Sequence, residues 1–133
     1  MDIHIESGVQ STAEAVVAYG DTAMAMGSGL AEVYATPAMI ALMEKAAYTA
    51  VQDRLPEGYS TVGTRIDVNH IAATPVGLKV WAKAILLETE GRKLVFDITA
   101  YDEKEKIGQA RHERFIIEEK RFMQKAYAKV DNP

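Results

Sequence analysis

Three polar side chains in this chain lie where the surrounding sequence is apolar, and together they could carry out acid–base chemistry. Glu44 is in the middle of "YATPAMIALMEKAAYTAV", residues 34–51, which otherwise has the composition of a buried helix. Thr36, Ile40 and Glu44 are spaced four residues apart, so they share one stripe of that helix. His70 falls on the apolar side of the strand expected to follow. A hydroxyl, a carboxylate and an imidazole are suited to moving protons at a reacting group.

The same residues also have a purely structural interpretation. A buried carboxylate destabilises a fold unless it is paired or hydrogen-bonded. Glu44 could therefore point to a solvated gap in the helix surface, or it could form a structural pair with His70. Residue types and spacing alone do not choose between the catalytic and the structural interpretation.

The helix that carries Thr36 and Glu44 has a well-marked beginning. We expect Thr36 to cap the first free N–H groups and Pro37 to take the first helical position, where its missing N–H is not needed. The helix should continue to about Arg54, and "LPEGYS" should then turn the chain. Because the helix is apolar around most of its circumference, a single sheet can hardly cover it, and we expect a second subunit.

The remaining segments predict strands around this helix. A first strand is expected over residues 11–18, followed by a glycine-rich loop over 19–29. Four alternating segments come after the helix: "STVGTRIDVNHIAAT", "GLKVWAKAILLETE", "GRKLVFDITAYDEK" and "KIGQARHERFIIEE". In the first of these, simple alternation places His70 on the apolar side and Gly63 on the opposite side. We predict an α+β fold in which a curled antiparallel sheet wraps around one long central helix.

Composition restricts the class of protein. With 133 residues and 48% hydrophobic content, residues 1–133 are expected to form a single domain. The net charge of −4 argues against a nucleic acid partner. No apolar run reaches the roughly 18 residues of a membrane span, so we expect no membrane partner. The N-terminus does not resemble a secretory signal, which favours a cytoplasmic location.

Other chemistries are disfavoured by the residues present. The chain has no cysteine, which excludes disulfides and thiolate catalysis. The segment "GSGLAE" begins like a dinucleotide-binding fingerprint but lacks its final glycine. His112, between arginines in "ARHERF", is more typical of a surface or satisfied core histidine than of a metal ligand, and we predict no metal site.

Two segments carry a resemblance to a known family. "GSGLAEVYATPAMIALMEKAA" and "TVGTRIDVNHIAATPVGLKV" resemble the fluoroacetyl-CoA thioesterase-like branch of the hotdog-fold acyl-CoA thioesterases. The resemblance extends over about residues 11–117. It implies a dimeric hotdog fold and a hydrolase of small or medium acyl-CoA thioesters. Coenzyme A would be part of the substrate, and no separate cofactor is expected.

The resemblance also implies roles for individual residues. The catalytic threonine, glutamate and histidine of the family fall on Thr36, Glu44 and His70, and two residues of its acyl pocket fall on Gly63 and Arg114. Glu44 would then act as general base or nucleophile. Thr36 would position the water or the carbonyl, and His70 would orient Glu44 or protonate the leaving thiolate. The loop "AMAMGSGLAE" departs from the hydrophobic lid of the family, so the sequence does not identify which acyl group is hydrolysed.

Two other functions fit a hotdog fold. An enoyl-CoA hydratase would use an aspartate and a histidine in other positions, and the sequence shows no such pair. A non-catalytic acyl-CoA-binding protein would leave Glu44 and His70 in structural roles. Basic residues near the C-terminus could contact the phosphates of coenzyme A, although a solvated face is the commoner role for such residues: Lys120, Arg121, Lys125 and Lys129.

Overall fold

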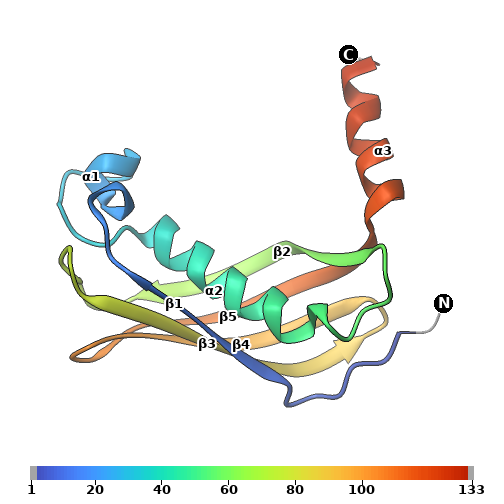
Figure 1. Ribbon diagram of the computed structural model, residues 1–133, viewed down its shortest axis with the longest axis horizontal. Helices are drawn as coiled ribbons and strands as arrows, with labels where there is room; N and C mark the ends of the chain where they lie inside the picture. Colours follow the sequence, from blue (N-terminus) through green and yellow to red (C-terminus); the bar gives the residue numbers. More distant parts are fainter. Residues whose placement is uncertain (1–2, 132–133) are drawn as a thin grey trace.

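Helix α2 (Thr36–Gln52) lies against one face of a five-stranded antiparallel sheet that curls around it (Figure 1). This computed structural model describes residues 3–131. The predicted α+β arrangement of a sheet around one long helix is confirmed. The other elements are β1 (Gln10–Val16), η1 (Tyr19–Asp21), α1 (Ala23–Met26), β2 (Tyr59–His70), β3 (Lys79–Glu90), β4 (Lys93–Asp102), β5 (Lys106–Glu118) and α3 (Glu119–Asp131).

The strands lie in the order β1-β3-β4-β5-β2. Tight turns join β3 to β4 and β4 to β5, and Gly91 in the first turn has a φ of 61°, which glycine adopts without strain. Strand β2 pairs with β5 and not with β1 or β3, its neighbours in sequence. The pairing extends from Tyr59 opposite Glu118 to His70 opposite Gly108. Strand β2 is therefore an edge of the sheet, and His70 stands at the end of that edge strand.

The core lies between α2 and the concave face of the sheet. Alternate residues of β3 and β4 point toward the helix, as their sequence pattern predicts. On the helix, Ala46 and Ala47 are fully buried, and their small side chains let the helix approach the sheet closely. The strand residues at the centre of this core are Val80, Ala82, Ala84, Leu86, Leu94, Phe96, Ile98 and Ala100.

One side of α2 is open to solvent in the single chain. Ala41, Lys45, Tyr48 and Thr49 are exposed and follow one another along the helix surface. This agrees with the expectation that a single sheet leaves part of the helix uncovered, and the second subunit stays a prediction. The many alanines make the helix read as apolar, yet the sheet covers only one side of it.

The hydroxyl of Thr36 does not cap α2, in contrast to the prediction. The helix begins at Thr36 itself, its N-cap is Ala35, and no side chain accepts a hydrogen bond there. Pro37 still lies in the first turn, where its missing N–H is tolerated. The hydroxyl of Thr36 is instead used in a contact with another part of the chain.

Helix α3 is an element that the sequence analysis did not predict. It continues from the end of β5 and projects away from the sheet (Figure 1). Its apolar side chains share one face and are exposed: Phe122, Met123, Tyr127 and Val130. Among residues 3–131, no helix combines the length and the apolar character needed to cross a bilayer.

Candidate functional site

A hydrogen bond between Thr36 and His70 forms one part of the candidate site. Thr36 is in the first turn of α2 and His70 is the last residue of β2, 34 residues later. The hydroxyl oxygen of Thr36 is 2.8 Å from Nδ1 of His70. Two of the three predicted catalytic residues are therefore brought together at the N-terminus of the helix.

The other side of the His70 ring has no hydrogen-bond partner. Nε2 is buried, and none of the described residues meets it with hydrogen-bond geometry. Burial lowers the pKa of His70 below its usual 6.5, and the nearby backbone of Ala72 opposes this shift only in part. The ring of Tyr34 packs edge-on against the imidazole, with ring centres 6.5 Å apart. The lowered pKa favours the neutral ring at pH 7, with Nδ1 bonded to Thr36 and Nε2 without a hydrogen bond among the described residues.

Glu44 forms a second part of the site, together with Arg114 of β5. Nη1 of Arg114 donates to Oε2 of Glu44 at 3.1 Å. The guanidinium is buried, whereas 40% of the Glu44 side chain is exposed. The carboxylate is therefore neutralised from the protein side and still open to a ligand from the other side.

The guanidinium of Arg114 is fixed by bonds to Thr61 of β2. Nε donates to the Thr61 hydroxyl at 2.8 Å, and Nη2 donates to the Thr61 carbonyl at 2.9 Å. The aromatic ring of Tyr48 lies 5.9 Å from the guanidinium carbon and adds a cation–π contact. These bonds aim the remaining nitrogen, Nη1, at Glu44.

His112, two residues before Arg114 on the same face of β5, completes this cluster. Its Nδ1 donates to the carbonyl of Arg65 at 2.8 Å, so in the neutral ring Nε2 is an acceptor. That Nε2 is 3.1 Å from Nη1 of Arg114 and 4.0 Å from Oε2 of Glu44. Burial lowers the pKa of His112 and the neighbouring Arg114 lowers it further, which together outweigh the opposing effects of the bond to the Arg65 carbonyl and of Glu44 and Glu113.

Gly63 leaves the space in which Glu44 lies. A Cβ atom at this position would be 2.5 Å from Oε2 of Glu44 and 3.3 Å from Nη1 of Arg114. The prediction that Gly63 faces away from His70 is wrong, because a β-bulge shifts the register of β2 between Gly63 and Arg65. The extra residue at the bulge inverts the in–out alternation of the residues that follow it. Gly63 and His70, seven positions apart, therefore both face the helix.

The two parts of the site are separate within one chain. The described contacts of Glu44 are with Arg114 and His112, whereas His70 contacts Thr36. Glu44 follows Thr36 by eight positions on the helix, which corresponds to a rise of about 12 Å. Within one chain, Glu44 therefore pairs with Arg114 and not with His70, which was one of the two structural alternatives.

Thr61 and His112 are site residues that the sequence analysis did not select. His112 and Arg114 are two residues apart on a strand, so they share a face, and this spacing could have linked them. Nothing in the sequence near Thr61 marks it as the acceptor for an arginine 53 residues away. Over residues 3–131, the histidines and carboxylates do not form a cluster of three that could hold a metal ion.

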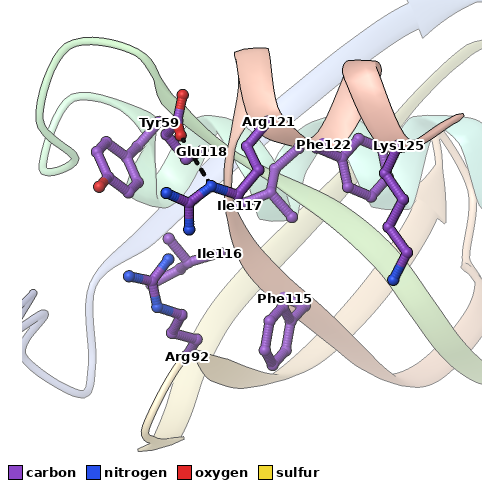
Figure 2. A pocket seen from close by; sticks show the side chains of 9 residues that line it. All are labelled: Tyr59, Arg92, Phe115, Ile116, Ile117, Glu118, Arg121, Phe122 and Lys125. Atoms are coloured by element: carbon purple, nitrogen blue, oxygen red, sulfur yellow. Dashed lines mark ion pairs between the residues drawn. The ribbon is translucent and has the colours of Figure 1, made fainter. Parts of the chain in front are cut away.

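A cavity of about 290 Å³ lies elsewhere, at the base of α3. Figure 2 shows Arg121 and Lys125 of α3 on one side of it and Arg92 and Phe115 on the other. Arg121 is 3.7 Å from the carboxylate of Glu118. None of the three predicted catalytic residues lines this cavity. The contact of these basic residues with coenzyme A stays a prediction.

Comparisons with known proteins show the family to which this chain is related. A family model described as fluoroacetyl-CoA-specific thioesterase, FlK, matches residues 17–120. The fluoroacetyl-CoA thioesterase of Streptantibioticus cattleyicolor is 42% identical over 99 residues, which cover 74% of this chain and 71% of that protein. The chain belongs to the fluoroacetyl-CoA-specific thioesterase family. The family and the thioesterase activity on acyl-CoA predicted from the motifs are thereby confirmed.

Solved structures extend the FlK comparison to almost the whole chain. A structure of the fluoroacetyl-CoA thioesterase FlK has a TM-score of 0.89 at 35% identity, covering 95% of this chain and 98% of that one. A thioesterase superfamily member from Thermus thermophilus has a TM-score of 0.86 at 26% identity, covering 96% and 94% of the two chains. A hot-dog-like protein from Thermanaerovibrio acidaminovorans shares the fold, with a TM-score of 0.83. The hotdog architecture is therefore that of a known group of thioesterases.

Proposed function

We propose that this protein hydrolyses a small or medium acyl-CoA thioester to the free acid and coenzyme A, with Thr36, Glu44 and His70 as its catalytic residues. The observation that carries this proposal is the 2.8 Å bond between Thr36 and His70 at the start of the central helix. Relatives in the FlK group support the substrate class, because they have been solved with fluoroacetate and coenzyme A and with acetyl-CoA.

The N-terminus of α2 is suited to bind the thioester carbonyl. The first N–H groups of a helix have no partner within it, and the helix dipole places partial positive charge at this end. When water adds to the carbonyl carbon, negative charge develops on the carbonyl oxygen. N–H groups already oriented toward that oxygen stabilise it in the transition state. The hydroxyl of Thr36 stands in this first turn and can position the attacking water or the carbonyl.

Proton transfer can pass through His70. With Nδ1 accepting from the Thr36 hydroxyl, the neutral ring carries its proton on Nε2, the nitrogen that has no partner. A carboxylate at Nε2 would complete a hydroxyl–imidazole–carboxylate series of the kind used in acyl transfer. Glu44 is the carboxylate we propose, as general base or as nucleophile. The C–S bond then breaks, which leaves the free acid. The thiolate of coenzyme A takes up a proton and departs as the thiol.

A second copy of the chain would bring these groups together. Thr36 and Glu44 are about 12 Å apart along one helix, which is too far for both to act on one carbonyl. The open side of α2 and the edge strand β2 are the surfaces on which a partner can pack. In a two-fold dimer, Glu44 of the partner subunit can approach His70, and the same contact forms twice.

Release of free thiol from a panel of acyl-CoA substrates, followed with a thiol reagent, tests this function. We expect turnover with short acyl chains and a dependence of the rate on chain length. An enoyl-CoA hydratase would instead change the enoyl absorbance without releasing thiol. Binding of acyl-CoA without any thiol release would show a non-catalytic protein and overturn the proposal.

A further inference from the structure

We infer that His112 is a positioning residue of this site: by accepting a hydrogen bond from Arg114, it holds the guanidinium in the orientation that pairs with Glu44. The inference rests on the proposed thioesterase function and adds to it a residue outside the three proposed catalytic groups. His112 is buried, with 2% of its side chain exposed, and its Nε2 is 4.0 Å from the Glu44 carboxylate. It therefore acts on Glu44 through Arg114.

The bonds of Arg114 show what His112 contributes. Thr61 accepts from Nε and from Nη2, which fixes one edge of the planar group. Nη1 carries two hydrogens, and its two acceptors are Glu44 and His112, each at 3.1 Å. With both hydrogens of Nη1 directed, the guanidinium cannot rotate without breaking a bond. Loss of the His112 acceptor would leave one buried N–H unpaired and free this end of the group.

The tautomer of His112 is set by the backbone. Its Nδ1 donates to the carbonyl of Arg65, the residue that follows the bulge in β2. This bond keeps Nε2 free of a proton and able to accept from Arg114. The bulge that brings Gly63 beside Glu44 thus also presents the carbonyl that orients His112. The bulge in β2 therefore has two effects: it places Gly63 where Glu44 needs space, and it places the carbonyl that orients His112 beside Arg114.

The neutral state of His112 also matters for charge. The charged groups that act on the pKa of the ring are Arg114, Glu44 and Glu113. A protonated ring would place a second cation next to the Arg114 guanidinium and would offer Glu44 a competing donor. The bond to the Arg65 carbonyl favours the proton, but burial and Arg114 outweigh it, so the ring stays a poor competitor for Glu44 and Arg114 remains the partner of the carboxylate.

Two substitutions of similar size separate positioning from packing. In His112→Gln the terminal amide reaches the position of Nε2, so its oxygen can still accept from Arg114. In His112→Asn the amide reaches only the position of Nδ1, so the bond to the Arg65 carbonyl survives and the acceptor for Arg114 is lost. We expect His112→Asn to lower kcat about ten- to hundred-fold with KM nearly unchanged, as removal of an orienting partner does. His112→Gln should keep most of kcat.

The thermal stability and far-UV spectrum of both variants must be measured with their kinetics. Equal kcat in His112→Asn and wild type would overturn the inference, as would equal losses in the Asn and Gln variants. If wild type releases thiol and Glu44→Gln does not, failure of the His112 prediction leaves the proposed function standing. Absence of thiol release from wild type would remove both.

A second measurement does not depend on turnover or on a folded variant. Restricted rotation of the Arg114 guanidinium should give separate, slowly exchanging Nη resonances in the NMR spectrum of wild-type protein. Arg65 and Arg111, on the same two strands but exposed, serve as internal controls with averaged resonances. Averaged Nη resonances for Arg114 in the native protein would contradict the inference.

Discussion

The two parts of the site differ in how completely their polar groups are satisfied. At the helix N-terminus, the Thr36–His70 pair has one short bond and one buried nitrogen without a partner. Two turns further along α2, the Arg114 guanidinium has four described hydrogen bonds, and one of them goes to Glu44. The first part is incomplete in a single chain, whereas the second is fully assembled.

This difference separates two requirements of catalysis. A group that must exchange protons with a substrate needs an atom that is free of other hydrogen bonds. An imidazole with both nitrogens already bonded could not donate to the substrate or accept from it. A group that must present charge needs fixed neighbours, so that no reorganisation is required during the reaction. Substitutions of the groups that hold Glu44 should therefore act through its position, whereas substitutions of Glu44 itself or of the Thr36–His70 pair should act on the proton transfer.

The largest effect is expected from Glu44→Gln. The amide keeps the shape of the side chain but cannot accept a proton or attack a carbonyl, so kcat should fall by about a thousand-fold. The fold should be retained, because the amide oxygen can still accept from Arg114. Thiol release and a thermal melt on the same preparation check both statements. Wild-type turnover in the folded variant would remove Glu44 from the mechanism.

Gly63→Ala should disturb the assembled part by steric contact. A methyl group 2.5 Å from the Glu44 oxygen forces the carboxylate to move. We expect kcat to fall by at least about ten-fold, since misplacement by an ångström is costly to a reacting group. The free energy of unfolding should fall by only about 1 kcal/mol or less, because the atom displaced is the end of a flexible, partly exposed side chain.

Gly20→Ala is the matched control for this substitution. Gly20 has no heavy atom within 4 Å of the position of a Cβ and does not have a positive φ. Kinetics and stability of Gly20→Ala should match wild type. Equal behaviour of the two alanine variants would show that Glu44 does not depend on the space at Gly63.

The incomplete part is tested by Thr36→Ala and Thr36→Ser. Because Thr36 is not the helix cap, Thr36→Ala should change the free energy of unfolding by only about 1 kcal/mol, the value of one hydrogen bond. Its kcat should fall by much more than this change explains, and Thr36→Ser should keep substantial activity because the hydroxyl survives. If turnover in both variants falls only with the folded fraction, Thr36 has no part in the reaction.

The smallest expected effect is on the pH dependence of stability. Burial lowers the pKa of both His70 and His112 below 6.5, so the unfolded chain binds more protons than the folded chain just below that pH. The free energy of unfolding should therefore be highest above pH 6.5 and should decrease as the pH falls from there through the lower pKa of each folded-state histidine. Denaturant titrations of wild type and His112→Gln should show a shallower decrease in the variant. An identical slope would exclude a contribution from His112.

Local patterns predicted the elements well because each depends on neighbouring residues. The alternation in β3 and β4 identified their buried faces, and "YATPAMIALMEKAAYTAV" identified the central helix. The errors came from long-range contacts. Thr36 has the residue type of a helix cap, but its hydroxyl finds His70 across the fold. The bulge beside Gly63 reversed a face assignment, since one extra residue inverts the alternation.

The residues of the site were only partly recoverable for the same reason. Thr36, Glu44 and His70 came from apolar surroundings and from the resemblance, which also supplied Gly63 and Arg114. That Glu44 pairs with Arg114, 70 residues away, depends on how β5 lies beside β2. Helix α3 was missed because its charged residues are as typical of a solvated tail as of a helix.

The projecting helix α3 has a consequence for how the molecule moves through solution. A rod extending from a rounded body increases friction without adding much mass, so the chain should diffuse more slowly than a sphere of 14.6 kDa. In gel filtration, such a monomer would elute early and could be mistaken for a dimer. Removal of residues 120–133 would restore the elution of a rounder particle. The proposed dimer is therefore better judged from scattered light intensity, which reports mass independently of shape.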